Sequence, residues 1–186
     1  MKPKIIRSKR KTLSMSWTDE GLVVRAPLGC GDEEIRNFLR SHQKWLEKTG
    51  AKWGETQARL GAIPELSREE LRLLQGEARD QVGARVAFYA PLVGVSYRQV
   101  RVHPMKSRWG SCSSKGNLNF NSLLVLAPPE VLDSVVVHEL CHRKFMNHSK
   151  EFYQEVYRIF PQYPACHRWL KEHGQELLCR LPKTKG

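Results

Sequence analysis

The chain has 186 residues, of which 40% are hydrophobic and 27% charged, a composition typical of a soluble globular protein and unlike a disordered or fibrous chain. A net charge of +12 favours anionic partners but does not specify a fold. No apolar run approaches the length of a membrane span, and the charged start is unlike a secretory signal. The five cysteines form no close C-x-x-C pair, which favours reduced thiols over a disulfide framework. We therefore expect a cytoplasmic protein that does not contact a membrane.

The N-terminal part predicts a β-hairpin followed by one helix. Apolar residues that alternate with polar ones predict the hairpin over residues 11–26. Asp32 can cap an amphipathic helix that ends near Gly50. Residues 51–66 show no clear periodicity and are predicted to form a connector, so residues 1–50 form an N-terminal hairpin-and-helix part.

The rest of the chain, residues 67–186, predicts a mixed arrangement of strands and helices. Ser67 and Glu70 form a capping-box pattern that opens a helix, which is expected to end at Pro91. Together these patterns predict an α+β fold in which residues 1–186 form a single domain. The further predicted elements are strands over 93–102 and 117–126 and helices over 129–146, from 149 and from 165.

One motif carries chemistry, the H-E-x-x-H pattern of residues 138–142. Residues at i and i+4 lie on one face of a helix, so the imidazoles of His138 and His142 can bind one zinc ion. Glu139 can reach a water molecule on such an ion and act as its general base. The pattern predicts a metal-dependent hydrolase.

A hydrolytic zinc site needs a third protein ligand, and His148 is the best candidate. It follows His142 by six residues, after a predicted break between two helices, where a chain reversal would present it to the same ion. His103, His167 and His173 are weaker candidates, because the first lies at a strand end and the others on a polar helix. Glu151 either orients His148 by accepting its second N–H or caps the following helix.

A longer series of segments resembles the YgjP-like metallopeptidase family, which is related to SprT-like proteins. The resemblance implies a minimal zincin fold, with a small, mostly antiparallel sheet, an H-E-x-x-H helix and an N-terminal hairpin and helix. It also implies zinc, or another divalent metal, at His138, His142 and His148, with Glu139 as general base. The segments that carry the resemblance are 108–121, 124–129, 135–142 and 147–152.

The substrate stays open between two classes. For a peptidase, residues 117–125 would form the sheet edge that pairs with an extended peptide. Asn119 and Asn121 would contact the peptide, and Arg108 would stabilise the oxyanion.

For a nucleotide pyrophosphatase, to which the family is also linked, the same site would hydrolyse a nucleoside triphosphate such as UTP. Residues 81–129 contain no acid, and Lys106, Arg108 and Lys115 would then neutralise the phosphates, with help from Arg101.

A third class is a nucleic-acid-associated protease of the SprT-like kind. Six basic residues without an acid lie within residues 2–11 and would supply weak, sequence-independent phosphate contacts. A monomer is expected in each case.

Overall fold

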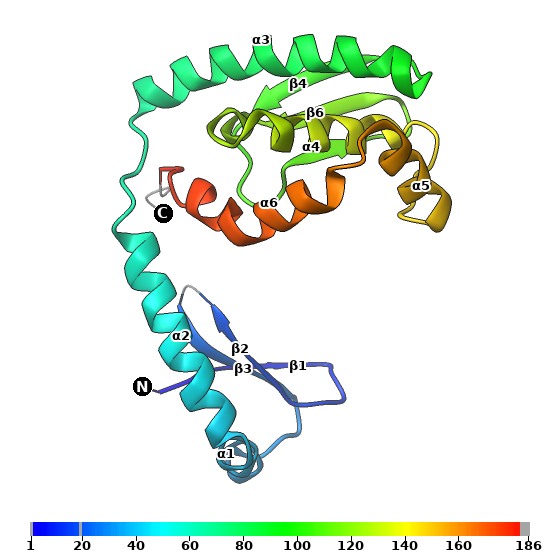
Figure 1. The fold of residues 1–186 in the computed structure, drawn as a ribbon. Coiled ribbons are helices and arrows are strands. Elements are labelled where there is room, and N and C mark those ends of the chain that lie inside the picture. Colours follow the sequence, from blue (N-terminus) through cyan, green and yellow to red (C-terminus); the bar gives the residue numbers. More distant parts are fainter. Residues whose placement is uncertain (1, 19, 183–186) are drawn as a thin grey trace. The chain divides into compact units, whose positions relative to one another are not determined.

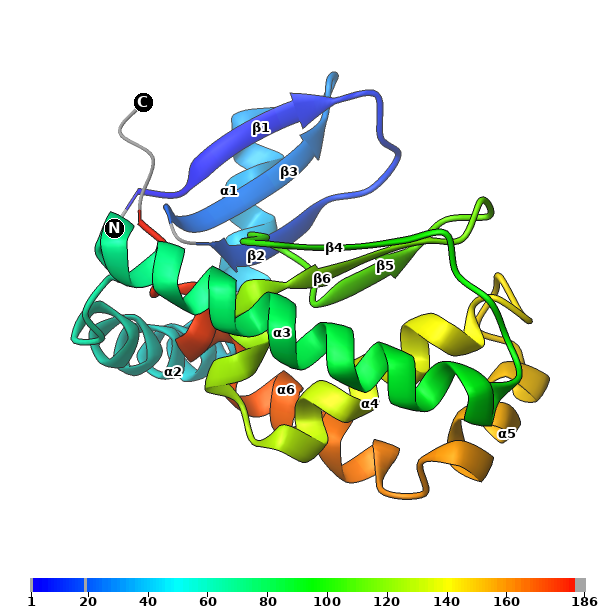
Figure 2. The same cartoon turned by 90° about the horizontal axis from the view of Figure 1, so that it is seen from above.

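The computed structural model describes residues 2–18 and 20–182 and shows a mixed α+β protein, as predicted (Figures 1 and 2). Contacts within the chain group it into two compact units, Met1–Ala62 and Ile63–Gly186, and the single domain stays a prediction. Each unit contains a three-stranded sheet and helices. Among the described helices, none is long and apolar enough to cross a bilayer.

The N-terminal unit contains the predicted hairpin and one strand more. Strands β2 (Ser14–Thr18) and β3 (Gly21–Pro27) pair antiparallel, which confirms the hairpin. Strand β1 (Lys4–Ser8) adds to β3 in parallel, so β3 is the central strand. No sequence pattern indicated β1, because both of its apolar side chains are about 40% exposed and the segment is rich in basic residues.

The helical part of this unit differs from the prediction in two ways. The expected single helix breaks at His42, which separates α1 (Asp32–Ser41) from α2 (Gln43–Gly61). The predicted connector over 51–66 is wrong for residues 51–61, which continue α2. The stacking of Trp53 on Trp17, with ring centroids 5.0 Å apart, packs this part of α2 against the hairpin, a long-range contact that local periodicity does not reveal.

The C-terminal unit is built around one sheet and a buried helix. Strands β4, β6 and β5 lie in that order, with α3 and α4 packed on one face and α6 packed against α4 (Figure 1). The elements are α3 (Arg68–Val93), β4 (Gln99–His103), β5 (Gly110–Cys112), β6 (Asn117–Asn121), the 3-10 helix η1 (Ser122–Leu126), α4 (Pro129–Cys141), α5 (Lys150–Ile159) and α6 (Tyr163–Leu178).

The connections of this sheet explain why it is not mostly antiparallel. The chain leaves β4, forms the edge strand β5 and returns through a tight turn into the central strand β6. Gly116 closes that turn with a φ of +82°, which glycine adopts without steric cost. Consequently β6 runs antiparallel to β5 and parallel to β4, and each sheet of the protein has one pair of each kind.

Two element ends differ from the prediction for local reasons. Helix α3 opens with the predicted capping box but continues past Pro91 to Gly94, where a left-handed glycine ends it. The predicted strand over 117–126 ends at Asn121, because its side-chain oxygen accepts a hydrogen bond from the Leu123 amide and starts η1. Side chains that would alternate along a strand are therefore buried together in η1.

Candidate metal centre

Three histidines converge at the end of the buried helix α4. His138 lies in the last turn of α4, His142 is the C-cap one turn later, and His148 precedes α5 after a reversal of the chain. The Nε2 atom of His138 lies 3.2 Å from that of His142 and 3.1 Å from that of His148. Among the described residues this is the one group of three side chains that could hold a metal ion.

The spacing of these nitrogen atoms fits tetrahedral zinc coordination. With Zn–N bonds of about 2.0–2.1 Å and tetrahedral angles, two ligand nitrogens lie about 3.3 Å apart. The observed separations of 3.1 and 3.2 Å are close to this value. A donor set of three imidazoles also matches hydrolytic zinc sites, which use three protein ligands and leave one position open.

The surroundings keep the imidazoles of His138 and His142 neutral and orient their lone pairs. Burial, with a smaller effect of the neighbouring histidines, lowers the pKa of His138 to about 3. Burial also lowers the pKa of His142. The Nδ1–H of His142 donates to the Phe145 carbonyl at 2.9 Å, so its Nε2 carries the free lone pair. Neutral imidazole is the form that binds a metal ion.

Tyr163, at the start of α6, orients the His138 imidazole so that its Nε2 carries the free lone pair. Its hydroxyl oxygen lies 2.9 Å from Nδ1 of His138, and its ring is buried. Burial raises the pKa of Tyr163, so the phenol stays neutral and can accept from the Nδ1–H.

Replacing Tyr163 with phenylalanine should therefore weaken metal binding without unfolding the unit. Loss of such a partner typically lowers metal affinity ~10–100-fold. Competition titration with a chromophoric zinc chelator measures the change. Tyr157→Phe is the matched control, because this tyrosine is exposed and should keep the wild-type affinity. An unchanged affinity in Tyr163→Phe would show that the hydroxyl does not orient His138.

The carboxylate of Glu139 is held against the edge strand β5. Glu139 is buried, and burial raises its pKa to about 8, with the charge of Arg108 acting in the opposite direction. A Cβ atom at Gly110 would lie 2.5 Å from Oε1 of Glu139 and 2.7 Å from its Cγ. The absence of a side chain at Gly110 therefore makes room for the carboxylate beside His138.

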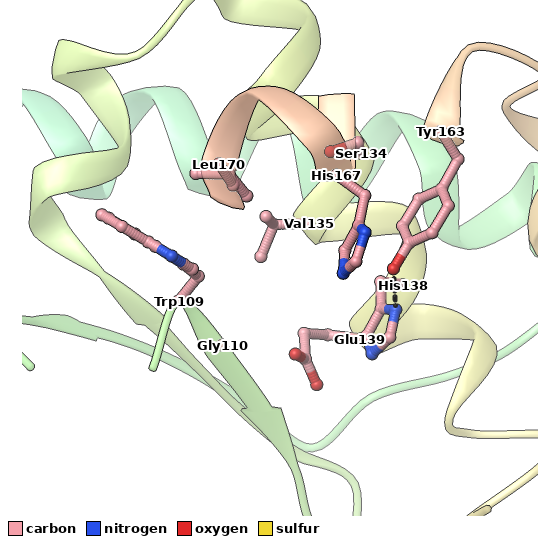
Figure 3. A pocket seen from close by; sticks show the side chains of 9 residues that line it. All are labelled: Trp109, Gly110, Ser134, Val135, His138, Glu139, Tyr163, His167 and Leu170. Atoms are coloured by element: carbon pink, nitrogen blue, oxygen red, sulfur yellow. Dashed lines mark hydrogen bonds between the residues drawn. The ribbon is translucent and has the colours of Figure 1, made fainter. Parts of the chain in front are cut away.

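A cavity of about 210 Å³ adjoins His138 and Glu139 (Figure 3). Val135 and Leu170 line it between the Trp109 indole on one side and His167 on the other. Gly174 of α6 packs against Trp109 so closely that an added Cβ would lie 3.0 Å from the indole ring. The remaining lining residues are Gly110, Ser134, Tyr163 and His167. The site thus combines a metal-binding group, a buried carboxylate and a largely apolar space for a substrate.

The basic residues predicted to bind substrate differ in their distance from this site. Arg108 is exposed and comes two residues before Gly110, and its charge acts on Glu139. Lys106 lies on the same segment, and Lys115 lies in the turn between β5 and β6. Both lysines are exposed, and their contact with substrate stays a prediction.

The two asparagines of β6 do not face the site, which corrects their assignment to substrate binding. Asn121 is fully buried, and its amide nitrogen donates to the carbonyls of Met105 and Arg108, so it holds the segment before β5. Asn119 donates to the Ser111 hydroxyl at 3.1 Å. Because successive side chains of a strand point to opposite faces, Ser111 and Asn119 lie on the face away from Gly110 and Glu139.

The sheet edge beside α4 also differs from the prediction. Strand β6, over 117–121, is paired on both sides and cannot accept a peptide strand. The edge strand beside α4 is β5, which contains Gly110. The alternation of residues along β6 predicted a strand, but it did not indicate that this strand is central in the sheet.

Glu151 acts at the start of α5. Its carboxylate accepts a hydrogen bond from the Ser149 hydroxyl, and this contact and its own amide lower the pKa of Glu151. Ser149 also caps the helix, because its hydroxyl accepts from the Phe152 amide. These contacts favour the helix-capping role of Glu151 over the orientation of His148.

Three contributors to the site were not identified from the sequence. Tyr163 and His167 come from α6, far along the chain from the motif, and no spacing rule links them to it. Gly110 directly follows Trp109 and belongs to no motif that carries chemistry. A glycine at a strand start is the one signal that could have indicated a close approach.

Fold and site together define an α+β protein whose H-E-x-x-H helix contributes to a group of three histidines that could hold a metal ion. A family model described as YgjP-like, metallopeptidase domain, matches residues 63–173, which make up more than half of the chain. The chain therefore belongs to the YgjP-like family, and its C-terminal unit is a metallopeptidase-type hydrolase domain.

Solved structures of two metallopeptidase zymogens are similar to part of the chain. Abylysin of Pyrococcus abyssi is 23% identical with a TM-score of 0.45, and the match covers 49% of this chain and 93% of abylysin. Jannalysin of Methanocaldococcus jannaschii is 21% identical with a TM-score of 0.44, and the match covers 49% of this chain and 94% of jannalysin. No curated protein matches the chain.

Proposed function

We propose that the chain is a zinc-dependent peptidase in which Glu139 is the general base. The observation that supports this most directly is the placement of the buried Glu139 carboxylate beside three converging imidazoles and at the wall of a cavity. Membership in a family of metallopeptidase domains agrees with it. Zinc at His138, His142 and His148 would supply a Lewis acid and lower the pKa of a bound water molecule.

The chain's own residues then perform the proton transfers. Glu139 accepts a proton from the attacking water and later gives it to the leaving amine, as one carboxylate can do both in sequence. Gly110 keeps the Glu139 carboxylate next to His138. The raised pKa of Glu139 makes it a stronger base than an exposed carboxylate.

Glu139→Gln should abolish peptide cleavage while zinc binding is kept. Proton transfer by a positioned base contributes ~10²–10⁴-fold, so we expect a loss of that size in kcat. The assay is the cleavage of an internally quenched peptide library by zinc-loaded protein, with zinc content measured by mass spectrometry.

Glu130→Gln is the matched control, because Glu130 is an exposed glutamate on the same helix. It should cleave at the wild-type rate. Cleavage that persists in Glu139→Gln, or that does not depend on added zinc, would contradict the proposed function.

Nucleotide hydrolysis is the second candidate, and the charge of Arg108 next to Glu139 favours it. Lys106, on the same exposed segment, could join Arg108 in neutralising phosphates. Release of pyrophosphate from a panel of nucleoside triphosphates, lost in Glu139→Gln, would move the function to this class. No release from any of them would exclude it.

A further inference from the structure

We propose that His167 is a catalytic residue that donates a hydrogen bond to the oxyanion formed during peptide cleavage. The inference rests on the proposed peptidase function. It assigns to a residue of α6 the oxyanion-stabilising role predicted for Arg108. His167 lines the cavity that Glu139 and His138 also line, but it is not part of the metal-binding group.

The position of His167 follows from the helix that carries it. Tyr163 and His167 are four residues apart on α6 and therefore lie on the same face. Their rings stack with centroids 5.7 Å apart and an interplanar angle of 21°. Tyr163 also contacts Nδ1 of His138. The Tyr163 ring therefore lies between His167 and the candidate metal ligand His138.

The side chain points into the cavity. Figure 3 shows the His167 ring on the α6 side and the Glu139 carboxylate on the opposite side, with open space between them. A peptide bond attacked by a water molecule beside Glu139 would lie in that space. Its carbonyl oxygen would have an imidazole N–H on the side away from Glu139.

Arg108 is placed differently. Both side chains are exposed, but Arg108 belongs to the segment before β5 and is not among the residues that line the cavity, whereas His167 is. Among the other lining side chains, the Ser134 hydroxyl donates to the Val131 carbonyl. The Tyr163 hydroxyl is held at Nδ1 of His138, and the Trp109 indole lies on the far side of Val135 from His138 in Figure 3. His167 is thus the lining side chain best placed to donate.

The chemistry needs no proton to leave His167. When the water oxygen bonds to the carbonyl carbon, the carbonyl π electrons move to its oxygen, and the water proton moves to Glu139. The imidazole N–H stabilises the resulting negative oxygen by a hydrogen bond. When the C–N bond breaks, its electrons go to nitrogen, which takes the proton from Glu139, and the carbonyl forms again.

His167→Ala should lower kcat and leave substrate binding nearly unchanged. Loss of one oxyanion donor costs ~10²–10³-fold in kcat. We would measure kcat and KM for the best peptide of the quenched library, using zinc-loaded full-length protein. Calorimetry would measure the affinity for a phosphinic analogue of that peptide, which mimics the tetrahedral oxygen, and this affinity should fall by a similar factor. His167→Gln, which keeps an N–H donor, should recover part of the rate.

His173→Ala is the matched control, since His173 lies on the same helix but packs against Trp169, with ring centroids 4.8 Å apart. It should match the wild type. The inference is overturned if His167→Ala keeps kcat within twofold or loses zinc. It is also overturned if the substitution weakens binding of the analogue and binding of the uncleaved peptide by the same factor, with the peptide affinity measured in the inactive Glu139→Gln background. If wild-type protein cleaves no peptide, the proposed function itself fails, which is a different outcome.

Discussion

Gly110→Ala should remove peptidase activity almost as completely as the loss of Glu139 itself. The added Cβ would lie 2.5 Å from Oε1, 2.7 Å from Cγ and 2.8 Å from Cδ of Glu139. These separations are shorter than those that Cβ atoms make with non-bonded atoms in proteins. Either the carboxylate must leave its place beside His138, or strand β5 must shift and change the wall of the cavity at Glu139. A base displaced by about an ångström can cost ~10²-fold, and removal of the base ~10²–10⁴-fold.

The measurement compares the peptide-cleavage rate, the zinc content and the thermal unfolding midpoint of the variant with those of the wild type. Zinc should be retained, because the nearest atoms to the added Cβ all belong to Glu139 and none to the three histidines. Gly83→Ala is the matched control: Gly83 lies in α3 with open space around its Cβ position, so activity should stay and the free energy of unfolding should rise by about 0.5–1 kcal/mol. Full activity in Gly110→Ala would show that Glu139 does not need its observed position.

The local part of the fold could be predicted from the sequence, because it depends on short-range patterns. The hairpin follows from alternation, and the start of α3 from the Ser67 and Glu70 capping box. Strand β1 and the second half of α2 could not be predicted in the same way. Their partners, β3 and Trp17, lie far away in the sequence, and their own residues carry no strong periodicity.

The convergence of the histidines could also be predicted in part, since His138 and His142 have a spacing that a helix alone explains. His148 required a chain reversal, which the break before α5 indicated. The substrate side of the site could not be predicted, because it depends on the order of strands. With β6 in the centre of the sheet, Asn119 faces away from Glu139, and only the structure shows that α6 supplies Tyr163 and His167.

The helix that carries the motif is fixed to α3 by a buried carboxylate. Asp133 of α4 accepts hydrogen bonds from Nε and Nη2 of Arg85, and the Tyr89 hydroxyl donates to it at 3.1 Å. Asp133 is 7% exposed, whereas the Arg85 side chain is 40% exposed and reaches water. Of Asp133, Arg85 and Tyr89, the buried Asp133 carboxylate therefore loses the most stabilisation when its hydrogen-bond partners are removed.

Asp133→Asn should lower the free energy of unfolding by about 2 kcal/mol, because hydrogen bonds to a charged group contribute ~1.5–3 kcal/mol and the exposed side of Arg85 reduces the loss. For a protein of this size the thermal midpoint should fall by roughly 4–8 °C. Calorimetry measures it, and Asp80→Asn, an exposed aspartate of α3, should change it by less than about 2 °C. Arg85→Met should lower the free energy of unfolding by at least as much as Asp133→Asn does, since it leaves the Asp133 carboxylate buried without its cation. In the double variant the two losses should not add, because both substitutions break the same contact. Additive losses would mean that Asp133 and Arg85 stabilise α4 independently and that their pairing does not hold this helix in place.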